Sequence, residues 1–177
     1  MSLTCISASI GSEPRVLVLG SMPGAASLAA GQYYAHPRNL FWPLVETLFG
    51  IDREQPYPDR CDALNAAGVA LWDVIARCDR NGSLDSAIDD KSVRANDFAS
   101  LFRAHPSIRH VAFNGRKAAQ TFERLVLPTL DEDRPEPHIL PSTSPANASI
   151  PFATKLSRWR VLLDWLNSSA VQVIPAF

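Results

Sequence analysis

The sequence predicts an α/β protein, a three-layer α/β/α sandwich with a central, four-stranded, mainly parallel sheet. Three observations lead to this fold class. Four short apolar runs each end at a turn or loop residue, and segments with helical periodicity separate them. The runs also lack strict alternation of apolar and polar residues, which is typical of parallel strands that are covered on both faces. Short buried strands that alternate with amphipathic helices favour this layered architecture.

Each element of the fold has its own signal. The predicted strands are Val16–Leu19 before Gly20, Val69–Trp72, Val111–Phe113 before Asn114, and Ile139–Leu140 before Pro141. Apolar residues three and four positions apart predict amphipathic helices across Phe41–Phe49, Phe98–Phe102, Ala118–Leu125 and Leu156–Leu166. Residues 50–66 and 76–95 are polar and rich in turn residues, and we expect them to be excursions from the one domain.

Length and composition predict one compact globular domain over residues 1–177. The chain has a formal net charge of -1, with 46% hydrophobic and 20% charged residues. A domain of this length buries roughly 70% of the surface of its unfolded chain, so its core needs no metal or disulfide. No apolar stretch of about 18 residues predicts a membrane span, and no secretion signal opens the chain. We expect a cytoplasmic protein with no membrane partner.

The number and spacing of the cysteines also favour a core without disulfides or metal. The chain has three of them, Cys5, Cys61 and Cys78, without a CxxC pair and without a histidine at ligand spacing from any of them. An odd number at wide spacing is atypical of a disulfide framework, a zinc site or an iron–sulfur cluster. The sequence therefore predicts no metal site and no cofactor, and a reducing compartment.

Charge is distributed unevenly along the chain. Residues 46–97 hold 11 acidic side chains against 6 basic ones, whereas residues 98–130 hold five basic side chains and only one acidic one. Further basic residues, Lys155, Arg158 and Arg160, lie near the C-terminus. This pattern is compatible with a basic face that meets phosphates, but also with a mixed solvated surface, because near-neutral proteins rarely depend on phosphate contacts.

The predicted topology selects the loops in which function is expected. In a parallel sheet of this kind, ligands bind outside the carboxyl ends of the strands. Four loops follow those ends, namely Gly20–Asn39, Trp72–Arg77, Asn114–Lys117 and Pro141–Pro151. The first is about 19 residues long, which is long for a connection between strand and helix and is typical of functional loops.

The first loop begins with the run Gly20, Ser21, Met22, Pro23, Gly24. Its glycines permit close approach of a ligand to the backbone, whose N–H groups can bind an anion or the edge of a base. Neither a P-loop nor a GxGxxG pattern is present. Several residues of these loops also have plain structural interpretations. Asn39 can cap the helix that follows, Phe41 and Trp42 can belong to the core, and His36 can stabilise its own loop.

Taken together, these segments resemble the uracil-DNA glycosylase superfamily. The resemblance rests on Gly20–Gly24 (GSMPG), on His36–Trp42 (HPRNLFW) and on Leu140–Pro145 (LPSTSP), and it covers roughly Val16 to Leu166. The segment Tyr33–Asn39 (YYAHPRN) and the form of the LPSTSP motif are most similar to the hypoxanthine-DNA glycosylase branch, often called family 6. Membership would imply the three-layer fold inferred above.

The resemblance also implies roles for individual residues. Asn39 matches the asparagine that is catalytic in this branch, and Phe41 matches an aromatic residue that stacks on the flipped base in mismatch-specific relatives. The implied base pocket comprises Gly20, Ser21, Met22, Pro23, Gly24, Tyr34, Phe41 and Asn114. The Ser142–Pro145 loop matches the motif that enters the minor groove and touches phosphates. The expected DNA-binding residues are His36, Lys117, Ser142, Thr143, Ser144 and Pro145.

Two positions depart from related branches of the superfamily. Met22 stands where mismatch-specific relatives have an asparagine, and Leu140 stands where monofunctional uracil enzymes have a histidine. A residue that activates water and one that stabilises the leaving base in those enzymes are therefore missing. The expected catalytic contribution falls on Asn39, whose side-chain carbonyl can hold a water molecule.

The expected function is that of a monofunctional DNA glycosylase. It would hydrolyse the N-glycosidic bond of deaminated bases in double-stranded DNA, with hypoxanthine first and uracil second, and would act as a monomer without a cofactor. Cleavage of this bond passes through an oxocarbenium-like sugar, so stabilising the departing base and placing one water suffice. Two alternatives remain open, a Ser21-dependent hydrolase that uses His36 or His138, and a non-catalytic module that binds nucleic acid or nucleotides.

Overall fold

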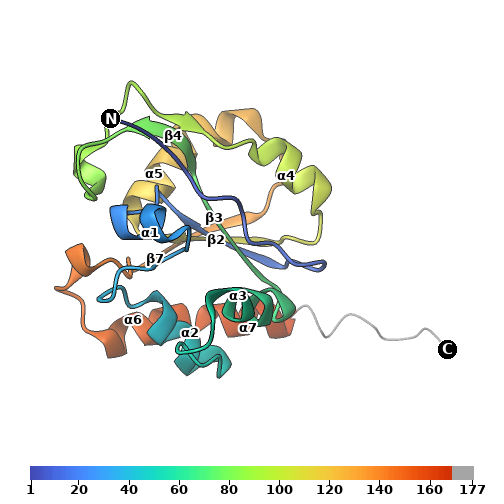
Figure 1. The fold of residues 1–177 in the computed structure, drawn as a ribbon. Coiled ribbons are helices and arrows are strands. Elements are labelled where there is room, and N and C mark those ends of the chain that lie inside the picture. Colours follow the sequence, from blue (N-terminus) through green and yellow to red (C-terminus); the bar gives the residue numbers. More distant parts are fainter. Residues whose placement is uncertain (169–177) are drawn as a thin grey trace.

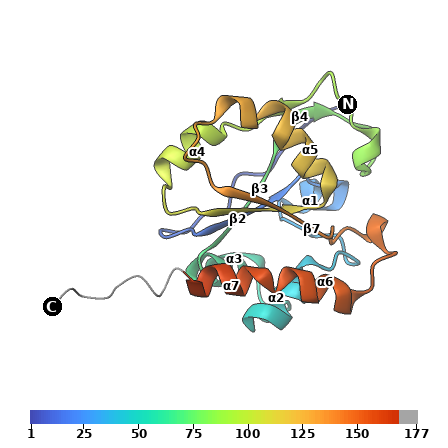
Figure 2. The ribbon, with the colours of Figure 1, turned by 180° about the vertical axis from the view of Figure 1, so that it is seen from behind.

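A computed structural model describes residues 1–168, and residues 169–177 of the predicted domain lie outside the described part of the chain. A central sheet lies between two layers (Figure 1). Helices α2, α3, α6 and α7 cover one face, and α4, α5 and a second small sheet cover the other (Figure 2). Among the described residues, no helix is long and apolar enough to cross a membrane.

The elements have the following bounds. The strands are β1 (Ser2–Thr4), β2 (Val16–Gly20), β3 (Val69–Asp73), β4 (Ile75–Asp79), β5 (Arg94–Ala95), β6 (His110–Asn114) and β7 (Glu136–Leu140). The α-helices are α1 (Ala25–Ala30), α2 (Phe41–Phe49), α3 (Tyr57–Ala66), α4 (Phe98–Ala104), α5 (Arg116–Leu125), α6 (Phe152–Trp159) and α7 (Val161–Ser168).

The central sheet has the order β3-β2-β6-β7, and all three of its strand pairs are parallel. The four predicted runs are its four strands, so the predicted fold class is confirmed. All five residues of β2 are buried, because this strand lies inside the sheet and both of its faces are covered. The register pairs Gly20 with Asp73, and Asn114 with Leu140, so that these four strand ends meet at one edge of the sheet.

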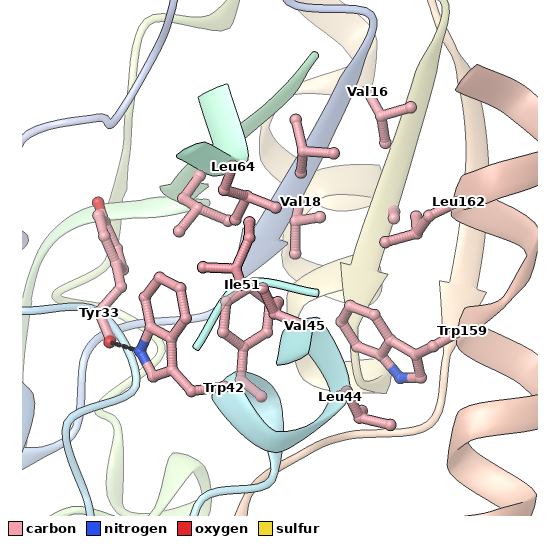
Figure 3. Close-up of a cluster of buried hydrophobic side chains, with 14 of the residues drawn as sticks. Val16, Val18, Tyr33, Trp42, Leu44, Val45, Ile51, Leu64, Trp159 and Leu162 are labelled. Atoms are coloured by element: carbon pink, nitrogen blue, oxygen red, sulfur yellow. Dashed lines mark hydrogen bonds between the residues drawn. The ribbon is translucent and has the colours of Figure 1, made fainter. Parts of the chain in front are cut away.

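The core has two main parts, one on each face of the sheet. On the face covered by α2, α3, α6 and α7, Val16 and Val18 pack against Trp42, Trp159 and other apolar side chains (Figure 3). On the other face, Leu17 and Leu19 pack with residues of α4 and α5. Successive strand residues point to opposite faces, which explains why neighbouring residues of β2 belong to different clusters.

Two predicted excursions contain regular structure. Residues 57–66 form helix α3, whose buried side chains are only Cys61 and Leu64, so its apolar stripe is too narrow to stand out in the sequence. Proline at its start was the available signal for a helix. Residues 75–79 and 94–95 join β1 in an antiparallel sheet, order β1-β4-β5. Strands of two to five residues that pair at long range carry almost no local signal.

The helix predicted across Leu156–Leu166 is divided. Helix α6 ends at Trp159 and α7 begins at Val161, with Arg160 between them in a right-handed helical conformation. The apolar periodicity continues through this junction because both helices pack on the same face of the sheet, where Trp159, Leu162 and Leu166 are buried together.

Candidate functional site

A cavity of about 270 Å³ lies at the edge of the sheet where the strands end. It is slightly smaller than the roughly 300–1,000 Å³ of typical ligand pockets. Its walls come from the loop after β2, from Asp73 at the end of β3, from Asn114 at the end of β6, and from the loop after β7. Residues 83–85 supply a further wall. The cavity therefore lies where the strand ends predicted a ligand site.

Hydrogen bonds of Arg80 and Ser21 fix the backbone of the loop that follows β2. The buried guanidinium of Arg80 donates to the backbone oxygens of Pro23 and Gly82, at 2.6 and 2.9 Å. The hydroxyl of Ser21 donates to Asp85 at 2.6 Å. The backbone N–H groups of Met22 and Gly24, by contrast, have no acceptor among the described residues. This loop thus presents unpaired N–H groups from a fixed backbone.

Tyr34 lies on the cavity wall in an unusual conformation. It has a φ of 59°, which a bulky residue adopts only when its surroundings enforce it. Both neighbours are pinned, because Trp42 Nε1 donates to the backbone oxygen of Tyr33 and Ala35 N donates to Ser27 Oγ. The Tyr34 hydroxyl is buried without a hydrogen-bond partner among the described residues. Burial and the nearby Asp73 raise its pKa, so the phenol stays neutral.

Phe41 does not line the cavity. Its side chain is 1% exposed within the core, and its ring stacks on that of Tyr34 with 4.0 Å between centroids. A base in the cavity would meet Tyr34 first, with Phe41 behind it. These surroundings favour the interpretation of Phe41 as a core residue, and its predicted stacking on the base stays a prediction. The run of aromatic residues made the sequence ambiguous at this point.

A tight turn presents Asn39 to the cavity. The backbone N–H of Asn39 donates to His36 O at 2.8 Å across Pro37, which is favoured at the second position of such turns. Asn39 Oδ1 accepts from the N–H of Phe41, the first residue of α2, at 3.0 Å. This bond fixes the amide orientation and holds the N–H of the first residue of α2, whose N-cap is Leu40. Its Nδ2 has no acceptor among the described residues, and the residue lines the cavity.

Asp73 is the residue that sequence reasoning missed. It lines the cavity and is 3% exposed, and its Oδ2 is buried without a hydrogen-bond partner among the described residues. Burial raises its pKa to about 8, Asp85 contributes to the rise, and Arg80 opposes the shift. The raised pKa favours the neutral carboxyl group of Asp73 at pH 7. The available signal was a carboxylate directly at the end of an apolar strand, inside one of the four selected loops.

Gly20 allows Asp73 and Tyr34 to approach each other. A Cβ at position 20 would lie 2.3 Å from Asp73 Oδ1 and 3.7 Å from the Tyr34 hydroxyl. Only glycine fits in that space without displacing the carboxyl group. Two buried polar groups without partners among the described residues consequently flank one glycine at the cavity. Such groups are rare in folded proteins, and a bound ligand or water would satisfy them.

Asn114 and Thr143 join the two remaining loops. Asn114 Nδ2 donates to Thr143 Oγ1, and Thr143 N donates to Asn114 Oδ1, each at 2.8 Å. The backbone oxygen of Thr143 also accepts from Leu40 N. Thr143 is 0% exposed and lines the cavity, and its hydrogen bonds fix the two loops to each other. Its predicted contact with DNA stays a prediction. Asn114 lines the cavity, but its amide is already engaged on both sides by Thr143.

The loop after β7 is anchored by helix α6. Trp159 Nε1 donates to Pro141 O at 2.9 Å, and Lys155 Nζ donates to Asn147 O at 2.8 Å. Lys155 is 0% exposed, so it cannot belong to a basic surface for phosphates. Ser142, Ser144 and Pro145 do line the cavity and are partly exposed. These three remain candidates for contact with DNA.

The other predicted site residues have different surroundings. Met22 is 6% exposed and packs in a third apolar cluster while it also lines the cavity. Lys117 lies outside the cavity, and its ammonium pairs with Asp90 at 2.8 Å. His36 lines the cavity, and its Nδ1 accepts from the backbone N–H of Arg38. The predicted Ser21, Pro23 and Gly24 are wall residues.

The alternative of a Ser21-dependent hydrolase finds no support. The Ser21 hydroxyl donates to the Asp85 carboxylate, and no histidine among the described residues bonds to it. His138 lies in the middle of β7, whereas the cavity begins at the end of that strand. A serine nucleophile needs a base within hydrogen-bond reach, and Ser21 has none among the described histidines. Among the described residues, His110, Glu136 and His138 form a cluster of side chains of the types that ligate metals, and this cluster lies outside the cavity.

Fold and site together define a three-layer α/β protein with a small cavity at its strand ends, whose wall includes Asn39 and Asp73. A family model of the uracil DNA glycosylase superfamily matches residues 8–166. The chain belongs to this superfamily.

Individual proteins refine the comparison. A hypoxanthine DNA glycosylase of Methanosarcina acetivorans is 38% identical over 133 residues, which span 75% of this chain and 80% of that protein. A hypoxanthine DNA glycosylase of Methanosarcina barkeri is 37% identical over 112 residues, 63% of this chain and 70% of that protein. The solution NMR structure of a uracil DNA glycosylase candidate from Methanosarcina acetivorans superposes with a TM-score of 0.78 at 33% identity, covering 94% and 99% of the two chains.

Proposed function

We propose that this chain is a monofunctional DNA glycosylase that removes deaminated bases from double-stranded DNA, with hypoxanthine as its first substrate and uracil as its second. It would thereby start base excision repair. The names of the two curated relatives support the choice of hypoxanthine. The observation that carries the proposal is the cavity itself, where Asn39 Nδ2, the Tyr34 hydroxyl and the Asp73 carboxyl group lack partners among the described residues.

Base selection would begin at Asn39. The bond from Phe41 N to Asn39 Oδ1 leaves Nδ2 as a donor for the ligand. Hypoxanthine and uracil carry a carbonyl oxygen where adenine and cytosine carry an amino group. A fixed donor favours the carbonyl and opposes the amino group, because the latter would leave two donors facing each other. Asn39 would therefore act through its Nδ2. We had expected a water molecule at Oδ1, but this oxygen already accepts the hydrogen bond from Phe41 N.

Asp73 would supply a proton to the departing base. A neutral carboxyl group can donate one hydrogen bond and accept another, and it does not repel the negative charge that develops on the leaving base. The unpaired N–H groups of Met22 and Gly24 would add donors at the same wall. Tyr34 would offer its ring face to the base, in the place that we had expected for Phe41.

The proposal of a monofunctional enzyme rests on the lysines. A glycosylase that also nicks the strand needs an amine nucleophile in its pocket. The chain has three lysines, Lys91, Lys117 and Lys155, and none of them lines the cavity. Lys117 is paired with Asp90 and Lys155 is buried against Asn147. Hydrolysis by water is the chemistry that this arrangement supports.

Incubation of the purified protein with duplexes that carry a single deoxyinosine should produce abasic sites, revealed as strand breaks after alkali. We expect no breaks before alkali, slower removal of uracil, and full activity in EDTA. EDTA should have no effect because the His110, Glu136 and His138 cluster lies outside the cavity. Breaks should need alkali because no lysine lines the cavity. Breaks without alkali would indicate a lyase instead. An unchanged duplex after prolonged incubation at high enzyme concentration would support the alternative of a non-catalytic binding module.

Contacts to the DNA backbone would come from exposed arginines around the cavity. Arg116 and Arg158 line a surface depression together with Ser142 and Asn147, and Arg38 is exposed in the turn before Asn39. About three neutralised phosphates predict a slope near -3 for log K against log salt. A shallow slope suits a protein with a net charge of -1.

The arginines can be tested by titration of labelled DNA at several salt concentrations. Arg158→Ala should weaken binding to damaged and undamaged duplexes alike and should make the slope shallower by about 1. Lys117→Ala serves as the control, because its ammonium is engaged by Asp90, and we expect a much smaller change. A large loss of affinity for Lys117→Ala, with none for Arg158→Ala, would show that the DNA lies on the other side of α5.

We further infer that the protein acts as a monomer in the cytoplasm. Each of the three cysteines is free, which suits a reducing compartment. One cavity on one chain holds all of the groups that the proposed reaction uses.

A further inference from the structure

We propose that His110, Glu136 and His138 form a binding site for a divalent transition-metal ion of the zinc type, separate from the base cavity. Nothing in the proposed excision reaction uses these three residues. The pairing register sets His110 of β6 directly opposite Glu136 of β7, and His138 follows two residues later on the same face. Two adjacent parallel strands therefore bring two imidazoles and one carboxylate together.

The three ligand atoms have the spacing of a metal site. His110 Nδ1 lies 3.3 Å from His138 Nε2, and Glu136 Oε2 lies 3.6 Å from each of those nitrogens. Donors around a tetrahedral zinc ion, with bonds of 2.0–2.1 Å, are about 3.3 Å apart. These three separations place a point in the plane of the atoms at about 2.0 Å from each of them. That distance equals the bond length of zinc to nitrogen or oxygen.

Hydrogen bonds among the three side chains explain their arrangement less well than a bound metal ion does. The two nitrogens can share one proton, but 3.6 Å is too long for a hydrogen bond from either nitrogen to Glu136. Glu136 thus lies beyond hydrogen-bond distance of both nitrogens and yet converges with them on one point, which suits a metal ion. The fourth position stays available for water, as in zinc sites with three protein ligands.

The surroundings hold the ligands in place. The ring of Trp165 on α7 stacks on His110 at 4.7 Å with an interplanar angle of 11°, and lies 4.2 Å from the ring of His138. The imidazole orientations are thus fixed by packing before an ion binds. The side chains of His110 and His138 are 20% and 25% exposed and that of Glu136 is 67% exposed, so an ion can enter from solvent.

The ligand chemistry selects the class of metal. Imidazole nitrogens favour zinc, copper, nickel and iron, whereas magnesium and calcium prefer oxygen ligands. The site spans the first residue of β6 and the first half of β7, and His110 lies about 13 Å along β6 from Asn114 at the cavity. A bound ion would join the beginnings of the two strands whose ends carry the cavity loops. It would not touch the base or the reacting atoms.

The test is equilibrium dialysis of the full chain, without a histidine tag and after treatment with EDTA, against Zn²⁺ at pH 7.5. We expect one ion per chain, an affinity loss of more than about 100-fold for His110→Ala and His138→Ala, and a loss of about 10-fold for Glu136→Gln. His105→Ala, which changes a histidine outside the cluster, should bind as the unchanged protein does. Failure to bind one ion, or retention of binding by the cluster variants, would overturn the proposal.

Two further measurements distinguish this site from binding of the ion by cysteine and from a loss of folding. Binding of Co²⁺ should give weak visible bands without the intense thiolate absorption that the free cysteines would cause, and a thiolate band would assign the ion to cysteine instead. The exposed Glu136→Gln variant should keep the unfolding midpoint of the unchanged protein in EDTA and lose only the increase that Zn²⁺ produces. Excision assays in EDTA test the proposed enzyme independently, because metal binding is measured without DNA.

Discussion

Replacement of Asn39 by alanine should lower the rate of hypoxanthine excision by about 100- to 1,000-fold, the usual cost of losing one preorganised donor at a charge that develops in the transition state. The structural basis is an amide whose oxygen accepts from Phe41 N and whose nitrogen is left for the base. Single-turnover assays on a duplex with one deoxyinosine, at enzyme excess, measure this step directly. Binding to undamaged duplex should stay nearly unchanged.

Asn39→Asp is the matched variant that separates catalysis from capping. An aspartate keeps the acceptor for the N–H of Phe41, so helix α2 should retain its start and the protein its stability, but it lacks the donor. We expect Asn39→Asp to excise as slowly as Asn39→Ala while it unfolds like the unchanged protein. Near-normal excision by Asn39→Asp would show that the acceptor suffices. If Asn39→Ala lost only about 1 kcal/mol of stability and kept its turnover, Asn39 would be a cap alone.

Hypoxanthine excision should decrease as the pH rises through about 8, close to tenfold per pH unit, because only the neutral form of Asp73 can donate to the base. Burial raises the pKa of this carboxyl group to about 8, so the productive form predominates at pH 7. The Tyr34 phenol does not interfere, since burial raises its pKa well above this range. Single-turnover rates between about pH 6 and pH 10 provide the measurement.

Two variants test whether Asp73 is the source of this decrease. Asp73→Asn retains a donor that does not titrate, so its excision should be slower at pH 7 but independent of pH above about 8. Asp85→Asn is the control, because Asp85 also lines the cavity and its charge contributes to the raised pKa of Asp73. That variant should keep the decrease and shift it to lower pH. A flat profile in the unchanged protein would exclude Asp73 as proton donor.

The same carboxyl group should reduce the stability of the protein. Its pKa is about 8 when folded against an ordinary value of 3.8, so the folded state binds more protons between those values than the unfolded state does. Stability must therefore decrease as the pH rises from about 4 to about 8, and should change little from this cause above 8. Asp73→Asn removes the effect, so its stability relative to the unchanged protein should increase as the pH rises from about 4 to about 8.

Urea unfolding at about pH 4, 6 and 8 checks this expectation, with Asp85→Asn for comparison. A stability difference that does not grow with pH would mean that Asp73 is ionised in the folded protein. Loss of activity combined with a gain in stability is the pattern expected of a residue whose unfavourable burial serves function.

Local patterns in the sequence were sufficient for the central fold. The apolar runs before Gly20 and Asn114 are strands because they have no polar residue to place on a wet face. The run before Pro141 ends the edge strand β7, which is largely exposed. The ends of all three runs indicated the edge that holds the cavity. Helix α3 and the small sheet were missed. Their apolar residues are few and their partners are distant in the chain, so no periodicity within a short window reports them.

The motifs identified the loops of the site but not the task of each side chain. GSMPG, the turn before Asn39 and LPSTSP all meet at one cavity, as their resemblance to the superfamily implied. Phe41 and Thr143 belong to these motifs, yet one lies in the core and the other joins two loops. An aromatic ring or a hydroxyl group has the same appearance in a sequence whether it faces a ligand or a neighbouring loop.

The chain by itself determined the sheet, the order of its strands along the sequence and the loops at their carboxyl ends, because strand burial and turn chemistry are local properties. Only the tertiary structure decided that Asp73 is neutral and that His110, Glu136 and His138 converge. Both depend on strand register, which pairs Gly20 with Asp73 and His110 with Glu136. Register sets distances between residues far apart in the chain, and such distances fix the pKa of a buried acid and the spacing of metal ligands.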